Sequence, residues 1–342
     1  MSLFSFTDAI HEATKSAMAD NRNIHVLGLG ASYRNGLDGT MGTLATEYPG
    51  RVHDTPCSEA AVTGAAVGMA TSGLHPRVHH GRIEFALYAL DGILTQAAKW
   101  DYMFGGNYPC PLTVRIAMGR QWGNGPQHTF TSKGIFAVPG LNVVCPSTPS
   151  MAYDLLYKAL ETQSPVIYLE SRWLYKTKET FNLNMEAQHY PVSLTRACIR
   201  RKGTDVTIVA IADMVLESLR AAKMLASVGI SAEVIDIVSI NPIDHFTIQQ
   251  SAIKTKRLFA VDASTPAFSV AHEILTDTPL GRSITCLDMA CATAPSLMRE
   301  YYPTAMEIAH QVSVSCGDAF KFTKADAQEL LAPTDNFDDL LL

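Results

Sequence analysis

The feature that most constrains the fold is an alternation of strand-like and helix-like segments along the chain. Short apolar runs indicate strands, and segments with helical periodicity or many small residues separate them. In the first half, strands are predicted at 24–28, 76–80, 112–118 and 165–170, and helices at 5–19, 59–72, 85–103 and 148–162. Such alternation is typical of parallel sheets covered by helices.

A second series of the same kind follows residues 171–203, which have mixed polarity and little periodicity and indicate a connecting segment. Its strands are predicted at 205–211, 232–238, 257–262 and 283–289, and its helices at 214–228, 245–255 and 266–276. The predicted fold class is therefore α/β, with two consecutive domains whose mainly parallel sheets are flanked by helices. We predict domains at 1–190 and 200–330, and a loosely held tail at 331–342.

Composition excludes several function classes. The 342 residues are 47% hydrophobic and 18% charged, which provides for two buried cores and gives no case for disorder. The net charge is -6 and basic residues are scattered, so neither nucleic acid nor an anionic membrane is an expected partner. No stretch approaches the roughly 18 apolar residues of a membrane span. Seven cysteines without a C-x-x-C pair indicate reduced thiols, and hence a soluble, cytoplasmic protein.

Two familiar binding motifs fail on inspection. Gly28 and Gly30 follow a strand, but Tyr33 stands where a dinucleotide-binding loop has its third glycine. His79 and His80 are adjacent on a predicted strand, so they point to opposite faces and cannot share a metal there. No metal site is predicted on this chain. Pattern alone identifies only a soluble two-domain α/β protein.

Five segments between residues 54 and 175 carry a family resemblance. They read DTPCSEAAVTG, FALYALDGI, GPQHTF, AVPGLNVVCPSTP and SPVIYLESRWLY, in that order. This sequence resembles the β subunit of the E1 component of 2-oxo acid dehydrogenases, such as pyruvate dehydrogenase E1 β, within the transketolase-like group. The resemblance implies a transketolase-like pyrimidine-binding domain, a transketolase C-terminal domain and thiamine diphosphate as the cofactor.

The resemblance also implies partners. In the family, the cofactor lies across a subunit interface, and a separate α subunit holds its diphosphate and Mg²⁺ through a G-D-G motif. This chain lacks that motif, since Gly36-Leu37-Asp38-Gly39 is only a superficial likeness. We therefore expect an α subunit and an α2β2 heterotetramer. The expected substrate is a small 2-oxo acid, and an E2 lipoyl protein is a possible acceptor.

Glu59 matches the family's catalytic acid. That carboxyl group hydrogen-bonds N1′ of the cofactor's aminopyrimidine and favours the imino tautomer that removes the proton from thiazolium C2. Alanines, valine and glycine follow Glu59, and this low-polarity setting suits a group that shares a proton. The alternative is an ordinary carboxylate interacting with a helix N-terminus.

Other family positions are matched less specifically. Phe85 matches an aromatic that packs near the pyrimidine ring, although a core aromatic opening a helix is the alternative. His128 matches an active-site histidine suited to proton transfer or charge stabilisation, and a solvated loop histidine is its alternative. Gln127 beside it is expected to position substrate. Asp91 is expected to support local packing.

The stretch before Phe85 departs from the family pattern. The family commonly has P-V-V-E-F-M-T-F-N-F where this chain has PRVHHGRIEF, residues 76–85. We hypothesise that Arg82 and one histidine, His80, contact an anionic or highly polar substrate. Tyr88, which replaces a usual Gln, is a further candidate for substrate contact. The alternative is that these side chains face solvent or the partner subunit.

Three functions remain open on the sequence. The first is a β subunit that decarboxylates a 2-oxo acid and transfers the acyl unit to an acceptor. The second keeps the cofactor but transfers a two-carbon unit to a polar or sugar acceptor, as in a split transketolase. The third is a catalytically silent scaffold for an α subunit, against which the joint presence of Glu59 and His128 argues.

Overall fold

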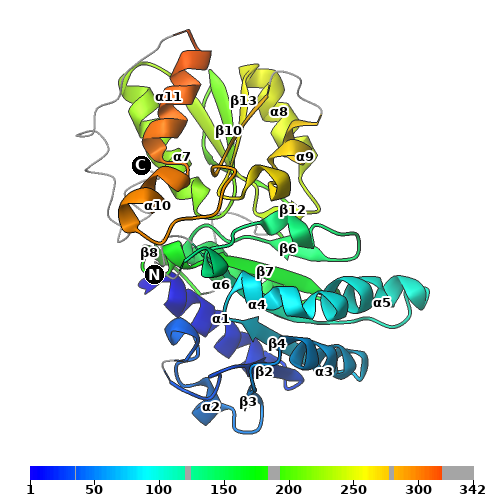
Figure 1. Ribbon diagram of the computed structural model, residues 1–342. Coiled ribbons are helices and arrows are strands. Elements are labelled where there is room, and N and C mark those ends of the chain that lie inside the picture. The colour runs from blue at the N-terminus through cyan, green and yellow to red at the C-terminus, as the bar shows by residue number, and fades with distance from the viewer. Residues whose placement is uncertain (35, 120–124, 184–192, 277–280, 318–342) are drawn as a thin grey trace.

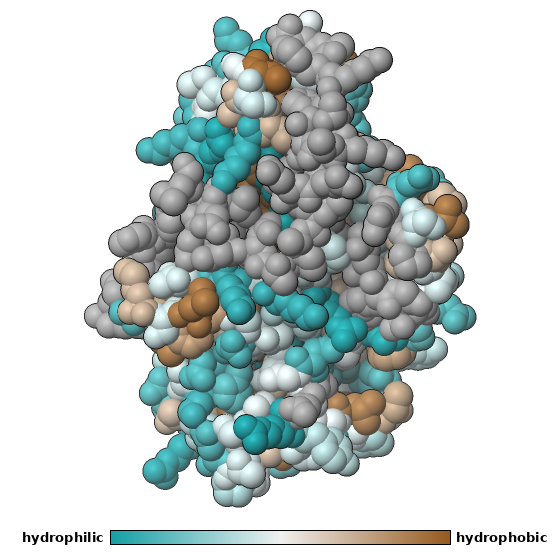
Figure 2. Space-filling view, turned by 90° about the vertical axis from the view of Figure 1, so that its left-hand side faces the viewer, coloured by the Kyte–Doolittle hydropathy of each residue, from teal (hydrophilic) through white to brown (hydrophobic). Residues whose placement is uncertain are grey.

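The computed structural model describes residues 1–34, 36–119, 125–183, 193–276 and 281–317. The chain forms two α/β units, one above the other in Figure 1, and each is built around its own sheet. The predicted tail and the predicted boundary at residue 190 lie outside these residues. On the side shown in Figure 2, hydrophilic residues predominate among the coloured ones, and apolar residues occur in small separate spots.

The first sheet has seven strands in the order β12-β6-β7-β5-β4-β2-β3. Their bounds are β2 (Ile24–Gly28), β3 (Val52–Asp54), β4 (His75–His80), β5 (Thr113–Met118), β6 (Asn142–Val144), β7 (Val166–Ser171) and β12 (Ser239–Asn241). All neighbours are parallel except β12 and β6. Every residue of β4, β5 and β7 is buried, as expected of a parallel sheet covered on both faces.

Strand β7 shows how the two faces divide the core. Val166 and Tyr168 belong to the cluster that contains α1 (Phe6–Asp20) and α6 (Pro149–Glu161), whereas Ile167 and Leu169 belong to the other cluster. That second cluster contains α3 (Glu59–Thr71) and the helical stretch of residues 83–103. The alternation of side chains along a strand therefore decides which helices each residue packs against.

The second sheet has the order β14-β13-β10-β11-β9, and all neighbours are parallel except β9 and β11. Its strands are β9 (Cys198–Arg201), β10 (Val206–Ala210), β11 (Ala232–Asp236), β13 (Leu258–Asp262) and β14 (Arg282–Thr285). The helices around it are α7 (Met214–Ser227), α8 (His245–Thr255), α9 (Ala271–Leu275), α10 (Pro295–Tyr301) and α11 (Ala305–Ser315).

Two features join the units. Strand β12 follows the second unit's β11 in sequence but pairs with β6 of the first sheet. Lys133, which lies shortly after the GPQHTF segment, forms a buried ion pair with Asp262 at the end of β13, with 2.7 Å between Nζ and Oδ1. A buried pair of this kind fixes position, because separating its partners would leave an uncompensated charge.

Several predicted elements need correction. The helix at 85–103 begins at Ile83 and changes type along its length, through α4 (Ile83–Ala86), a 3₁₀ turn, a π-helical stretch (Asp91–Ala97) and α5 (Ala98–Met103). The connecting segment at 171–203 contains β8 (Lys178–Phe181) and β9. Strand β8 pairs with β1 (Ser2–Ser5), which was not predicted. Nor were α10, α11 and the short α2 (Leu44–Glu47).

Candidate active site

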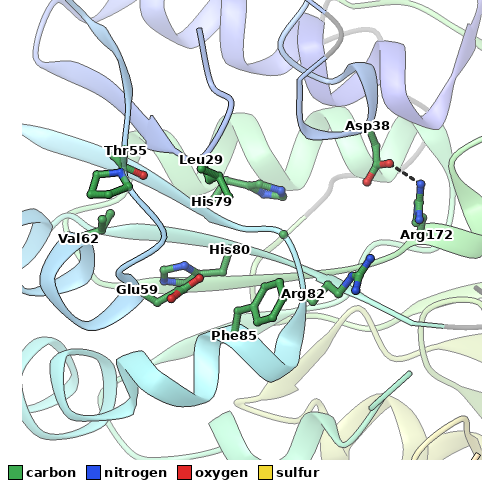
Figure 3. A pocket seen from close by; sticks show the side chains of 12 residues that line it. Leu29, Asp38, Thr55, Glu59, Val62, His79, His80, Arg82, Phe85 and Arg172 are labelled. Carbon is green, nitrogen blue, oxygen red and sulfur yellow. Dashed lines mark hydrogen bonds and ion pairs between the residues drawn. The ribbon is translucent and has the colours of Figure 1, made fainter. Parts of the chain in front are cut away.

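A pocket of about 370 Å³ opens where four strands of the first sheet end. Its wall contains residues at or just after the carboxyl ends of β2, β3, β4 and β7, and residues of α3 and α4 complete it (Figure 3). The lining residues are Leu29, Asp38, Thr55, Pro56, Glu59, Val62, His79, His80, Gly81, Arg82, Phe85 and Arg172. The carboxyl edge of a parallel sheet is where α/β proteins usually bind ligands.

Glu59 occupies one end of the pocket. It is the first residue of α3, and its side chain is partly buried. The Cys57 thiol lies 3.7 Å from Glu59 Oε1. Val62, one turn along α3, and Phe85 add apolar surface to the same pocket. The chain therefore places one carboxyl group against an apolar wall at the helix N-terminus.

His80 lines the pocket near Glu59, and a residue of α3 contacts its ring. Its Nε2 is 2.9 Å from Thr63 Oγ1 in α3. Burial lowers the pKa of His80 to about 4, so the ring is neutral near pH 7. His79 projects from the opposite face of β4, where burial, then Arg115 and Arg77, lower its pKa well below the usual range. Both histidines line the pocket, because it opens at the end of their strand. Their lowered pKa values make both rings neutral there.

The other end of the pocket carries fixed charges. Arg172 Nη2 donates to Asp38 Oδ1 at 2.5 Å, and both side chains are about one-third exposed. Arg82 approaches from the turn after β4, with its guanidinium carbon 5.9 Å from the Phe85 ring centre. Figure 3 shows its side chain extending toward Arg172. A partly exposed ion pair is worth about 0–1 kcal/mol, so an incoming anion could replace Asp38 as the partner of Arg172.

His128 stands behind Phe85 rather than in the pocket wall. Its ring meets that of Phe85 edge-on, with 5.7 Å between centres and an interplanar angle of 70°. The loop is tied to α4, because the Phe130 backbone N–H donates to Glu84 Oε1 at 2.6 Å. Burial raises the pKa of Glu84. His128 Nδ1 is buried and has no hydrogen-bond partner among the described residues.

Two predicted contact residues lie apart from the pocket. Gln127 is exposed beside His128, and Tyr88 is 74% exposed on the outer side of the helical stretch after α4. Neither belongs to the described lining of the pocket. The structure thus brings Glu59, His80, Arg82 and Phe85 together, with His128 one ring away. It leaves Gln127 and Tyr88 on the surface.

Sequence reasoning missed Asp38 and Arg172. Asp38 belongs to the segment treated as a superficial likeness of a diphosphate motif, and Arg172 belongs to the SRWLY end of a recognised segment. The signal for Arg172 was its place directly after a buried strand, because the ends of parallel strands converge at one edge. Asp38 gives no comparable signal, since it lies in an irregular loop far from any predicted strand end.

Comparison with known proteins agrees with this geometry. The model of the transketolase pyrimidine-binding domain matches residues 3–178, and that of the transketolase C-terminal domain matches residues 195–313. The chain is 34% identical to the β subunit of acetoin:2,6-dichlorophenolindophenol oxidoreductase from Bacillus subtilis, covering 90% of this chain and 95% of that one. It is 38% identical to the mitochondrial pyruvate dehydrogenase E1 subunit beta-1 of Arabidopsis thaliana, covering 78% and 74%.

A solved structure shows the same fold. A split-gene transketolase in an inactive β4 tetramer superposes with a TM-score of 0.77 over 93% of this chain and 100% of that one, at 23% identity. The fold and pocket define a transketolase-like protein of two consecutive domains, as predicted. The chain belongs to the family of E1 β subunits of 2-oxo acid dehydrogenases. The predicted boundaries at residues 190 and 200 stay a prediction.

Proposed function

We propose that this chain is the β subunit of a thiamine diphosphate enzyme that decarboxylates a 2-oxo acid and transfers the acyl unit. The observation that carries the proposal is the position of Glu59, at the N-terminus of α3 and in the wall of the strand-end pocket. The family membership supports the cofactor class. In this proposal the chain is not a catalytically silent scaffold for an α subunit, because Glu59 is present in the pocket wall.

The residues present fit the pyrimidine end of the cofactor. A carboxyl group beside the apolar Val62 and Phe85 suits a flat ring that carries one basic nitrogen. The pocket volume falls within the usual range of about 300–1,000 Å³ for small-ligand sites. Across the described ranges, no group of three His, Cys, Asp or Glu side chains could hold a metal. We therefore assign Mg²⁺ and the diphosphate to an α subunit.

When bound, thiamine diphosphate supplies the nucleophilic carbon and the electron sink that decarboxylation requires. In this proposal, Glu59 holds a proton against the pyrimidine ring, and Phe85 packs on it. The neutral His80 offers a hydrogen bond without adding charge beside Glu59. His128, whose ring contacts that of Phe85, is proposed as a proton donor or acceptor for the substrate.

The partners belong to the proposal as well. An α2β2 assembly is supported by the family, and by the small side chains Ala60, Ala61, Gly64 and Ala65, which leave an exposed face of α3 beside Glu59 open to close packing. An E2 lipoyl protein is proposed as one acceptor. None of the described helices is long and apolar enough to cross a membrane. The cytoplasmic location stays a prediction, and several relatives are mitochondrial proteins.

The test is reconstitution. The chain would be co-expressed with an E1 α-type subunit and assayed with a panel of 2-oxo acids, with and without a lipoyl acceptor. We expect cofactor-dependent decarboxylation by the complex and none by the β chain alone. A complex that assembles but binds no thiamine diphosphate would overturn the proposal.

A second candidate function is favoured by the charged end of the pocket. Arg82 and Arg172 both line it, which suits a two-carbon transfer to an anionic or sugar acceptor. His79 and His80 are buried and neutral, so in this proposal His80 contacts such a substrate as a hydrogen-bond partner and the arginines supply the charge. Competing phosphorylated and neutral acceptors against each other separates the two functions. A clear preference for the phosphorylated acceptor would support this second one.

A further inference from the structure

A polar cluster lies beneath the pocket, on the sheet face covered by α1 and α6. It consists of Arg77 and His79 of β4, Arg115 of β5 and Glu170 of β7. All four side chains are buried, and the two arginines are wholly inaccessible to solvent. Arg77 and His79 share a face because they are two positions apart on one strand, and His79 pairs in register with Arg115.

The carboxylate of the cluster is already engaged. Arg115 forms a bidentate pair with Glu170, with Nε–Oε2 and Nη2–Oε1 distances of 2.7 and 2.6 Å. Its Nη1 donates to Thr40 Oγ1 at 2.9 Å, and the Tyr175 hydroxyl donates to Glu170 Oε1 at 2.5 Å. Arg115 and Glu170 therefore neutralise each other, and both oxygens of Glu170 already accept hydrogen bonds, although the carboxylate still attracts Arg77 at longer range.

The guanidinium of Arg77 is the one charge in this cluster that the Arg115–Glu170 pair does not balance. Within the part of the chain that the structure describes, its one hydrogen-bond contact is a weak one, from Nη1 to Met41 Sδ at 3.7 Å. Its Nε and Nη2 are buried without a hydrogen-bond partner among the described residues. Burial, and then repulsion by Arg115, lower its pKa to about 9. Because His79 is neutral, the cluster carries a net charge of one positive unit near pH 7.

An isolated buried cation is costly unless something pairs with it. The two positions also depart from the family pattern that the sequence resembles. Arg77 and His79 stand where that pattern, P-V-V-E, has Val and Glu, so this chain has a cation and lacks a carboxylate there. A bound anion would restore neutrality, and its charge should be a single negative unit.

We propose that Arg77 binds a small monovalent inorganic anion, such as chloride, through its Nε and Nη2 groups. The anion takes the electrostatic place of the carboxylate that the family pattern has at position 79. It is a structural ion, which stabilises the sheet under the pocket and takes no part in the reaction. This site does not depend on the proposed function.

The first experiment locates the ion directly. Crystals of the full chain grown or soaked in sodium bromide are examined for anomalous scattering. We expect a peak within hydrogen-bond distance of Arg77 Nε and Nη2. Peaks at surface positions alone, which would show an adventitious ion only, overturn the proposal. This measurement uses the natural sequence and does not depend on a variant that folds.

The second experiment measures stabilisation. The Tm of the full chain is compared in sodium chloride and sodium gluconate at equal ionic strength. We expect chloride to raise Tm, by roughly 2 °C for each tenfold increase in concentration above its Kd. Arg77→Val and His79→Glu should each lose this difference, the first by removing the cation and the second by supplying a carboxylate. Arg22→Val, at an exposed position, should keep it. Equal Tm values in both salts for the natural chain would overturn the proposal.

Discussion

The two ends of the pocket differ in how far they follow the family. At one end, Glu59, Val62 and Phe85 form a carboxyl group against an apolar wall. At the other, Arg82 and Arg172 face Asp38. Arg82 is a departure from the family pattern, whereas Glu59 matches it. We infer from this comparison that cofactor chemistry and substrate choice depend on different residues, so that each can be altered separately.

The largest expected effect is at the Glu59 end. Glu59→Gln keeps the shape of the side chain but cannot share a proton, so decarboxylation by the assembled complex should fall about 10²- to 10⁴-fold. Thiamine diphosphate binding and circular dichroism should stay near the natural values. Glu161→Gln, at an exposed position, is the matched control. Retention of more than about a tenth of the activity, on the scale of that range, would remove Glu59 from the mechanism.

The next largest effect is expected at the charged end of the pocket, and it should depend on the charge of the substrate. Arg172→Gln removes a charged hydrogen-bond donor, so kcat/KM for a substrate with a further anionic group, such as a phosphate, should fall roughly 10- to 150-fold. For a 2-oxo acid whose carboxylate is its only charge, the change should be small. Arg82→Ala should act in the same direction. If Arg82→Ala and His80→Ala changed no constant for any substrate, the anionic-substrate hypothesis would fail.

Between pH 7 and 4, His80 should respond while the arginines stay charged. Its pKa is about 4 in the folded chain, below the usual value of about 6.5 in an unfolded one. The unfolded chain therefore binds the extra proton, and the free energy of unfolding should fall as pH drops from 6.5 to 4. The contribution is at most about 1.4 kcal/mol per pH unit. His80→Gln should flatten this slope in urea titrations, and His272→Gln, at an exposed position, should not.

The smallest effect concerns the packing behind His80. A Cβ at Gly92 would lie 2.9 Å from the Cγ2 methyl group of Thr63, whose hydroxyl contacts His80. Gly92→Ala should therefore lower the free energy of unfolding by about 1–3 kcal/mol. Gly68→Ala meets nothing within 4 Å and should raise it by about 0.5–1 kcal/mol. Equal effects of the two changes would show that Thr63 is free to move.

The strongly periodic elements were predictable, and the irregular ones were not. Strand β2 and helix α8 have the predicted bounds, because β2 is a short, mainly apolar run and α8 begins directly after Asp244, whose side chain caps it. Strands β8 and β9 were missed, since short edge strands depend on partners distant in sequence. Glu59 was found through its motif, whereas Asp38 required knowledge of which loop covers the strand ends.

The sequence by itself determined the α/β class and the family, and it singled out Glu59 as the proposed acid, because these depend on periodicity and on local motifs. Only the tertiary structure decided that Arg172 joins Arg82 in one pocket. It also decided that His79 and His80 are neutral and that Arg77 lies buried beside a carboxylate that is already engaged. Charge state and pairing depend on burial and on neighbours brought together by the sheet, and no local pattern contains that information.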